Sequence, residues 1–155
     1  MEHVIKNESM QKSVCELLNV LLANEYVLYT KLRNFHWNVV GPHFQDYHKF
    51  FEETYNEVEE DIDETAERIR TLNQRPLSSM KEFLEHTTLK ESVQTHMSAS
   101  QMLDELINDY EHLILTFNEN IATCDEIGDV GTEDFLTGMM QEYEKKLWML
   151  KSMNS

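Results

Sequence analysis

The sequence predicts an all-α protein, built as a four-helix bundle with a long crossover in the middle of the chain. Only two prolines and four glycines interrupt 155 residues, which favours long helices. Apolar residues recur at helical spacing in four separate segments. The connection between the second and third segments is much longer than the other two. The length corresponds to one domain, expected to span residues 1–155 with a short flexible segment over about residues 1–10.

The first two helical segments are predicted to form an antiparallel pair. The apolar pattern of the first runs from Val14 to Phe35, and that of the second runs from Phe44 to Leu72. Gly41–Pro42 lies between them and interrupts the helical pattern. Because the connection is so short, the two helices are expected to lie side by side in opposite directions.

The last two helical segments are predicted to form a second antiparallel pair. Their apolar patterns run from Leu103 to Ile121 and from Phe135 to Leu150. The short break between them covers Gly128 to Thr132. Two pairs of this kind complete the four helices of a bundle.

The crossover from Asn73 to Met97 joins the two pairs and is too long for a tight turn. It contains a short amphipathic piece, roughly Met80 to Glu85. Two possible capping boxes, at the start of this piece and at the start of the third long helix, are Ser79 with Glu82 and Ser98 with Gln101. A long crossover between two helical hairpins is typical of ferritin-like bundles.

The charge balance excludes several classes of function. The chain has 13 basic and 29 acidic residues, a formal net charge of −16. Such a surface repels nucleic acid and anionic lipid and attracts cations. No apolar run is long enough to span a membrane, and Met1 to Ser13 lacks the apolar core of a signal peptide. Cys15 and Cys124 give no disulfide framework, so a cytoplasmic location is expected.

Possible metal ligands concentrate in the first two helical segments. His36 lies near the end of the first. In the second, His48 and Glu52 are four residues apart, as are Asp63 and Glu67, so each pair projects from one face of a helix. Imidazole with carboxylate is a ligand set that suits first-row metals, iron in particular.

These residues cannot form one complete site on a single helix. On a helical wheel, His48, Glu52, Asp63 and Glu67 share a stripe that flanks the apolar face. From Glu52 to Asp63 the helix rises about 16 Å, whereas metal–ligand bonds are about 2 Å long. A second copy of the helix, packed antiparallel about a two-fold axis near Glu57, would bring the two pairs together and create two equivalent sites. The chain also lacks the Glu-x-x-His motif of intrachain di-iron bundles.

A simpler interpretation stays open for the same residues. Residues 52–67 carry nine acidic side chains and no basic one, and a run of this kind is usually a solvated helix face. Histidine at an isolated position, such as His36, is more often structural than a metal ligand. The metal hypothesis is favoured because one geometry would use both histidines and both carboxylate pairs.

The stretch NFHWNVVGPHFQDYHKFFEETYNEVEEDIDETAERI, together with RPLSSMKEFLE in the crossover and LWML in the final helix, resembles the Dps family, the DNA-binding proteins from starved cells. The resemblance implies a ferritin-like subunit in a hollow dodecamer with ferroxidase sites across two-fold axes. The implied ligands are His36, His48 and Glu52 from one chain, with Asp63 and Glu67 from its partner. Fe²⁺ would be oxidised there, by hydrogen peroxide or dioxygen, and stored inside as a ferric mineral.

The resemblance has further implications for individual residues. The family commonly has aspartate where this chain has Glu52, so the carboxylate position differs by about one bond length. Trp37 is implied as a radical trap, and a buried packing role is the alternative. Three acids near the turn before the last helix are implied to line an iron-entry pore: Asp125, Asp129 and Asp134. Their alternative is structural, with Thr132 capping that helix and with Glu133 and Asp134 in its first turn.

DNA binding is the family property that the sequence does not support. The N-terminal segment has only Lys6 and Lys12, balanced by two glutamates, instead of a lysine-rich tail. With a net charge of −16 per chain, phosphate binding is unfavourable. A nucleoid-compacting Dps remains the alternative function, and a helical assembly without metal chemistry is a third hypothesis.

Overall fold

Four long α-helices and one short one make up most of residues 7–155, the part of the chain that the computed structural model describes. They are α1 (Glu8–Asn38), α2 (Phe44–Thr71), α3 (Met80–His86), α4 (Ala99–Ile127) and α5 (Val130–Met153). No strand occurs in this part of the chain. The predicted four-helix bundle, with a crossover that carries a short helix, is confirmed.

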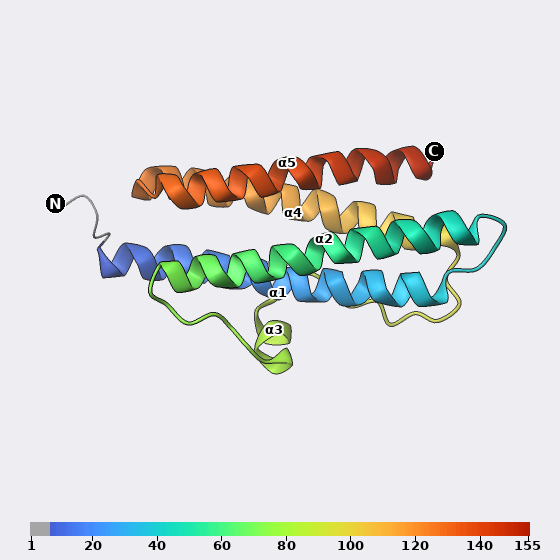
Figure 1. The fold of residues 1–155 in the computed structure, drawn as a ribbon, viewed down its shortest axis with the longest axis horizontal. Helices are drawn as coiled ribbons and strands as arrows, with labels where there is room; N and C mark the ends of the chain where they lie inside the picture. The colour runs from blue at the N-terminus through green and yellow to red at the C-terminus, as the bar shows by residue number, and fades with distance from the viewer. Residues whose placement is uncertain (1–6) are drawn as a thin grey trace.

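The helices pair as the short connections predict. Figure 1 shows α1 beside α2 and α4 beside α5, with each pair antiparallel. Gly41, between α1 and α2, has a φ of 122°, which glycine adopts without strain. Gly128, between α4 and α5, has a φ of 81° and ends α4 in the left-handed conformation. Both predicted breaks occur, but the second is shorter than Gly128 to Thr132, because α5 already begins at Val130.

The helix ends extend beyond the apolar patterns, because terminal turns are polar. Asn7 caps α1 by accepting a hydrogen bond from the Ser9 N–H, so the helix already includes residues 8–10 of the segment expected to be flexible. Residues 1–6 of that segment, with Lys6, lie outside the described residues.

The two predicted capping boxes have different outcomes. Ser98 and Gln101 form the complete reciprocal box at the start of α4. Ser79 caps α3, but the Glu82 carboxylate accepts from the N–H of Ser78 instead of that of Ser79. The predicted box at α3 is therefore only half present, because the Ser79 cap forms but the reciprocal hydrogen bond from the Ser79 N–H to Glu82 does not.

The crossover is attached to α1 by specific contacts. The Asn24 Oδ1 accepts from the Thr87 hydroxyl and the Thr88 N–H, each at 2.7 Å. The Tyr26 ring stacks on Phe83 of α3, with ring centres 4.1 Å apart. These contacts hold α3 beside α1 and on the side away from α2 (Figure 1).

The apolar face of α2 packs into the core, as the helical wheel predicts. Phe51, Val58 and Ile69 are fully buried, whereas Glu52 and Asp63 are exposed. Burial of three such side chains stabilises the fold by about 1.5–3 kcal/mol each. The predicted ligand stripe therefore follows the border between the core and the surface.

Candidate metal centre

His36 and His48 hold each other in place across the α1–α2 pair. The two rings stack, with centres 3.8 Å apart and planes at 12°. The His36 Nδ1 lies 2.7 Å from the His48 backbone oxygen, and the His48 Nδ1 lies 2.7 Å from the His36 backbone oxygen. Because a carbonyl oxygen only accepts, each Nδ1 carries the proton and donates it. In the neutral form of each ring the lone pair therefore lies on Nε2, the atom available to a metal.

Neighbouring aromatic rings restrict the two imidazoles further. Phe44 stacks on His48 at 4.8 Å, and the edge of Tyr55 meets His36 at 5.4 Å between ring centres. His36 is buried and His48 is half-buried. The sequence singled out both histidines, and the structure brings them together with their orientation fixed before any metal binds.

Glu52 follows His48 by one helical turn and is exposed. Its neighbour Glu53 makes an ion pair with Lys49, at 3.8 Å between Nζ and the carboxylate. The Glu53 carboxylate is therefore engaged by Lys49 on the same helix. Glu52 stays the predicted carboxylate ligand of the histidine end.

Asp63 and Glu67 form a close carboxylate pair at the other end of α2. A hydrogen bond with Asp63, and then the negative charge of Asp63, raises the pKa of Glu67 above its ordinary value. Two exposed carboxylates this close repel each other unless a proton or a cation lies between them. The pair is therefore suited to a cation.

One chain does not bring the five predicted ligands to a single point. Within residues 7–155, no three His, Cys, Asp or Glu side chains are arranged to hold a metal ion. His36, His48 and Glu52 gather at one end of α2, and Asp63 with Glu67 occupies the other. Two incomplete halves are what the spacing predicts, and their joining by a second copy remains a prediction.

Trp37 is on the surface beside the histidine end. Its side chain is 65% exposed, and its ring centre lies 5.5 Å from the Arg33 guanidinium carbon. Within residues 7–155 the Trp37 side chain is not buried, so the alternative role as a buried packing aromatic is wrong for the single chain. The implied radical-trap role is untested and remains a prediction.

The three acids predicted for an entry pore differ in their surroundings. Asp125 and Asp134 are exposed, whereas Asp129 is buried. Asp129 caps α5 by accepting from the N–H and the hydroxyl of Thr132, and it pairs with Arg68 at 3.5 Å. The alternative prediction named Thr132 as the cap, which is wrong because Thr132 is the residue that donates to the cap.

A buried acid in the middle of the bundle, Glu25, and the half-buried Asp61 whose charge acts on it were not predicted from the sequence. Glu25 of α1 is fully buried, and its carboxylate accepts a hydrogen bond from the Thr65 hydroxyl at 3.3 Å. Burial, followed by the charge of Asp61, raises the pKa of Glu25 well above its ordinary range. Burial and the charges of neighbouring glutamates also raise the pKa of Asp61 to about 7. A signal existed in the sequence, because Glu25 continues the apolar spacing of Leu18 and Leu28.

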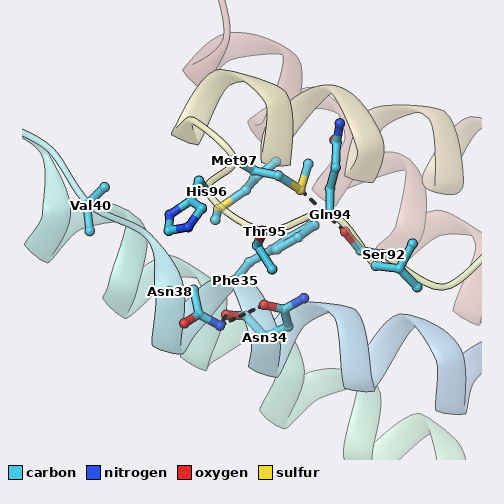
Figure 2. A pocket seen from close by; sticks show the side chains of 11 residues that line it. Asn34, Phe35, Asn38, Val40, Ser92, Gln94, Thr95, His96 and Met97 are labelled. Carbon is cyan, nitrogen blue, oxygen red and sulfur yellow. Dashed lines mark hydrogen bonds between the residues drawn. The ribbon is translucent and has the colours of Figure 1, made fainter.

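A cavity of about 510 Å³ lies between the end of α1 and the crossover. Figure 2 shows Asn34 and Asn38 on one side of it, with Thr95 and His96 on the other. None of the five predicted ligands lines this cavity. It is therefore separate from the candidate metal centre.

The comparisons with known proteins agree with the fold. The family model described as the ferritin-like domain matches residues 15–155. The DNA protection during starvation protein 2 of Bacillus anthracis is 39% identical over 143 residues, which cover 92% of this chain and 97% of that protein. The Dps structure from Staphylococcus aureus has a TM-score of 0.90 and 40% identity, covering 94% of this chain and 97% of that one. The chain belongs to the Dps family.

A further comparison is with a Dps structure whose description names a chemical class. The Dps structure from Vibrio cholerae O1, described as a member of a broad superfamily of ferritin-like diiron-carboxylate proteins, has a TM-score of 0.92 and 32% identity. It covers 96% of this chain and 93% of that one. The histidines and paired carboxylates of this Dps protein have the donor types that such chemistry requires. None of the helices in residues 7–155 is long and apolar enough to cross a membrane.

Proposed function

We propose that this protein stores and detoxifies iron by oxidising Fe²⁺ at sites shared between two copies of the chain. His36, His48 and Glu52 of one copy would face Asp63 and Glu67 of the other. The observation that carries the proposal is the reciprocal histidine pair. Both imidazoles keep Nε2 available because each Nδ1 is used by the backbone of the other residue.

Charge and spacing support a site between copies. Asp63 and Glu67 lie close together and exposed, with no lysine or arginine paired to them among the interactions of residues 7–155. A divalent cation shared with the imidazoles of a second copy would relieve their repulsion. A two-fold axis across α2 then produces two equivalent sites from one contact.

The chemistry uses hydrogen peroxide, or dioxygen, as the oxidant. One peroxide accepts one electron from each of two Fe²⁺ ions, and its oxygen atoms end as water or hydroxide. Hydrolysis of the ferric ions then gives an oxyhydroxide mineral and releases protons. Because peroxide and Fe²⁺ are consumed together, less hydroxyl radical forms, which protects the cell from oxidative damage.

Storage requires a closed assembly, for which a hollow dodecamer is proposed. Asp125 and Asp134 expose carboxylates beside the α4–α5 turn, and a ring of such groups would concentrate cations at an entry pore. Asp129 belongs to the same segment and supports it from inside as the cap of α5.

Mixing two inactive variants tests the shared site directly. His36→Ala and Asp63→Ala are each expected to abolish rapid oxidation of Fe²⁺ by peroxide, followed by ferric absorbance. Co-assembly of the two variants in equal amounts restores one intact site in each mixed pair, so about a quarter of the wild-type sites return. A site within one chain gives no recovery, which would overturn the proposal. Glu53→Gln is the matched control and should keep full activity.

DNA protection is the second candidate, because the relative in Bacillus anthracis carries it in its name. The net charge of −16 per chain opposes phosphate binding. We therefore expect no gel retardation of duplex DNA at neutral pH, even in low salt. Strong retardation would make DNA compaction the main function.

A further inference from the structure

Two methionine thioethers and one imidazole line the cavity between the end of α1 and the crossover. They belong to His96, Met97 and Met102, and the cavity has a volume of about 510 Å³ (Figure 2). Thioether sulfur is a soft ligand that selects Cu⁺, and imidazole binds copper as well. We call these three residues the thioether site.

The start of α4 places the two methionines together. Ser98 is the N-cap of α4, so Met97 precedes the cap and Met102 is the fourth residue after it. Side chains at these two positions often pack against each other as a hydrophobic staple. The reciprocal hydrogen bonds between Ser98 and Gln101, at 2.9 and 3.1 Å, fix the turn of chain that joins them. Both methionines are buried, so the capped turn holds two thioethers on the inner side of the cavity.

The sulfur of Met97 is directed toward the crossover. The Ser92 hydroxyl, which also lines the cavity, donates a hydrogen bond to the Met97 Sδ at 3.4 Å. A methionine that only filled the apolar core would have its sulfur among carbon atoms. Thioether sulfur is a weak hydrogen-bond acceptor, so a soft metal ion would be a stronger partner for it than this hydroxyl.

His96 lies at the mouth of the same cavity, directly before Met97 in the chain. Its side chain is exposed, and within residues 7–155 no hydrogen bond, ion pair or ring contact holds the imidazole. Its φ of 60° is in the left-handed region, which residues other than glycine adopt infrequently. The chain thus accepts an unfavourable backbone conformation at the residue that brings an unengaged imidazole to the cavity.

The cavity lining carries no carboxylate, although the chain has 29 acidic residues. Apart from His96, its polar side chains are neutral amides and hydroxyls, from Asn34, Asn38, Ser92, Gln94 and Thr95. Hard cations prefer carboxylate oxygens and therefore favour the acidic face of α2. Neutral sulfur and nitrogen donors suit a soft ion with a single positive charge.

We propose that the thioether site binds Cu⁺ through the sulfur atoms of Met97 and Met102 and one ring nitrogen of His96. The ion enters from solvent past His96 and exchanges its water for the two thioethers. Phe35 is fully buried and lines the same cavity, so the surroundings of the bound ion are apolar. All three ligands are neutral, so binding releases no proton and transfers no electron.

The thioether site would give the protein a role that does not depend on the proposed iron oxidation. Free Cu⁺ gives one electron to hydrogen peroxide, which splits into hydroxide and hydroxyl radical while the ion becomes Cu²⁺. Thioether ligands favour Cu⁺ over Cu²⁺ because the softer ion binds sulfur better. Copper held by this site is therefore withheld from the reaction with peroxide.

Anaerobic competition with bicinchoninate tests the site in the assembled, full-length protein. This chelator forms a coloured Cu⁺ complex, so loss of colour measures the Cu⁺ that the protein takes. Wild type should take one more Cu⁺ per chain than Met97→Leu/Met102→Leu, whose leucines keep the apolar volume without sulfur. Cys15 and Cys124 are present in both proteins, so copper on the thiols does not contribute to the difference. Equal uptake overturns the proposal.

The matched control removes two thioethers from elsewhere in the chain. Met139→Leu/Met149→Leu changes α5, outside the cavity, and should take as much Cu⁺ as wild type. Circular dichroism and gel filtration check that each variant is folded and assembled. Loss of the same Cu⁺ in this control would show that the methionines act through the fold and would refute the thioether site.

Replacement of His96 tests the third ligand. Asparagine adopts the left-handed conformation more readily than other residues, so His96→Asn keeps the backbone and removes the imidazole. The affinity for Cu⁺ should fall at least roughly tenfold. His43→Asn, at another exposed histidine, should leave the affinity unchanged. Unchanged affinity in His96→Asn would contradict the proposed ligand set.

A crystal of wild type soaked with Ag⁺ tests the position without any variant. Ag⁺ has the charge of Cu⁺ and the same preference for thioethers, and it scatters X-rays anomalously. The expected result is an anomalous peak between the side chains of His96, Met97 and Met102. Silver bound at other residues, with no peak in this cavity, would overturn the proposal.

Discussion

The two ends of α2 carry the two halves of the proposed site, but the chain holds them in different ways. At the N-terminal end, His48 is stacked on His36, and two hydrogen bonds of 2.7 Å to backbone oxygens fix both rings. At the C-terminal end, Asp63 and Glu67 are exposed and close enough to oppose each other's charge. One half is oriented in advance, and the other is left with unfavourable electrostatics that a cation would relieve.

The difference explains how the proposed shared site would stay inactive in a single chain. The imidazoles are part of the α1–α2 contact, so they contribute to the stability of the fold in addition to their proposed role in metal binding. The carboxylates slightly oppose folding, and metal binding is only their proposed role. Mutations at the two ends should therefore have similar effects on iron oxidation and opposite effects on stability.

Replacement of His36 should have the largest effect on unfolding. His36→Ala removes a buried ring, its stack on His48 and a hydrogen bond, so the free energy of unfolding should fall by about 2–4 kcal/mol. His43→Ala is the matched control, because His43 is exposed and makes no side-chain capping bond. Urea unfolding followed by circular dichroism measures both. Equal stability of the two variants would contradict the view that the histidine end is part of the fold.

Replacement of Glu25, in the middle of the bundle, should have the next largest effect on the free energy of unfolding. The size of this effect should depend on pH. The pKa of Glu25 is raised in the folded protein, so its contribution to stability is complete below about pH 4.5 and is lost as pH rises toward the folded pKa. Glu25→Gln cannot ionise and should unfold about 1–2 kcal/mol less easily than wild type at pH 8. The advantage should disappear near pH 4.

Urea unfolding across this pH range measures the effect of Glu25→Gln. Glu16→Gln, an exposed change on the same helix, should show no pH-dependent difference from wild type. A Glu25→Gln variant that is less stable than wild type at pH 8 would contradict the prediction that the ionised carboxylate destabilises the fold.

Changes in the carboxylate pair should have a smaller effect, in the opposite direction to that of His36→Ala. Asp63→Asn removes one of two opposed charges, so the thermal midpoint of the metal-free protein should rise slightly at pH 7. Added Mn²⁺ should then raise the midpoint of wild type and not that of the variant, because only wild type has the complete cation site. Scanning calorimetry measures both, and a lower midpoint in metal-free Asp63→Asn would contradict the comparison.

Glu52 should affect unfolding least, because its side chain is exposed and belongs to the surface of α2. Glu52→Gln should lower Fe²⁺ affinity at least roughly tenfold without changing the thermal midpoint. Glu52→Asp keeps a carboxylate and should preserve iron oxidation. Calorimetric titration under anaerobic conditions compares them with Glu53→Gln. Normal affinity in Glu52→Gln would remove this residue from the proposed site.

Most of the fold could be predicted from the sequence because helical periodicity is a local property. The four long helices, both short breaks and the crossover followed from apolar spacing and a few glycines and prolines. The helix ends were predicted less well, since polar terminal turns such as residues 8–13 carry no apolar pattern. The sequence did not predict that Asp129 caps α5, because Asp129 and Thr132 are both residue types that cap helices.

Some features of the candidate site could likewise be predicted from the sequence, and others could not. The residue types and the 16 Å rise between the two halves, about the length of three helical turns, follow from the sequence and helix geometry alone. Three features could not be predicted in this way: the proton positions on the two histidines, the exposure of Trp37 and the burial of Glu25. Each depends on which neighbour lies across the contact between helices.

The sequence by itself determined the helices, their order and the placement of two ligand pairs along one face of α2. Only the tertiary structure decided that His36 and His48 bind each other's backbone and that Glu25 is enclosed in the core. The physical reason is the separation in sequence over which each interaction acts. Helix formation and side-chain spacing depend on residues within a few positions, whereas hydrogen bonds, ring contacts and burial depend on how α1 packs against α2.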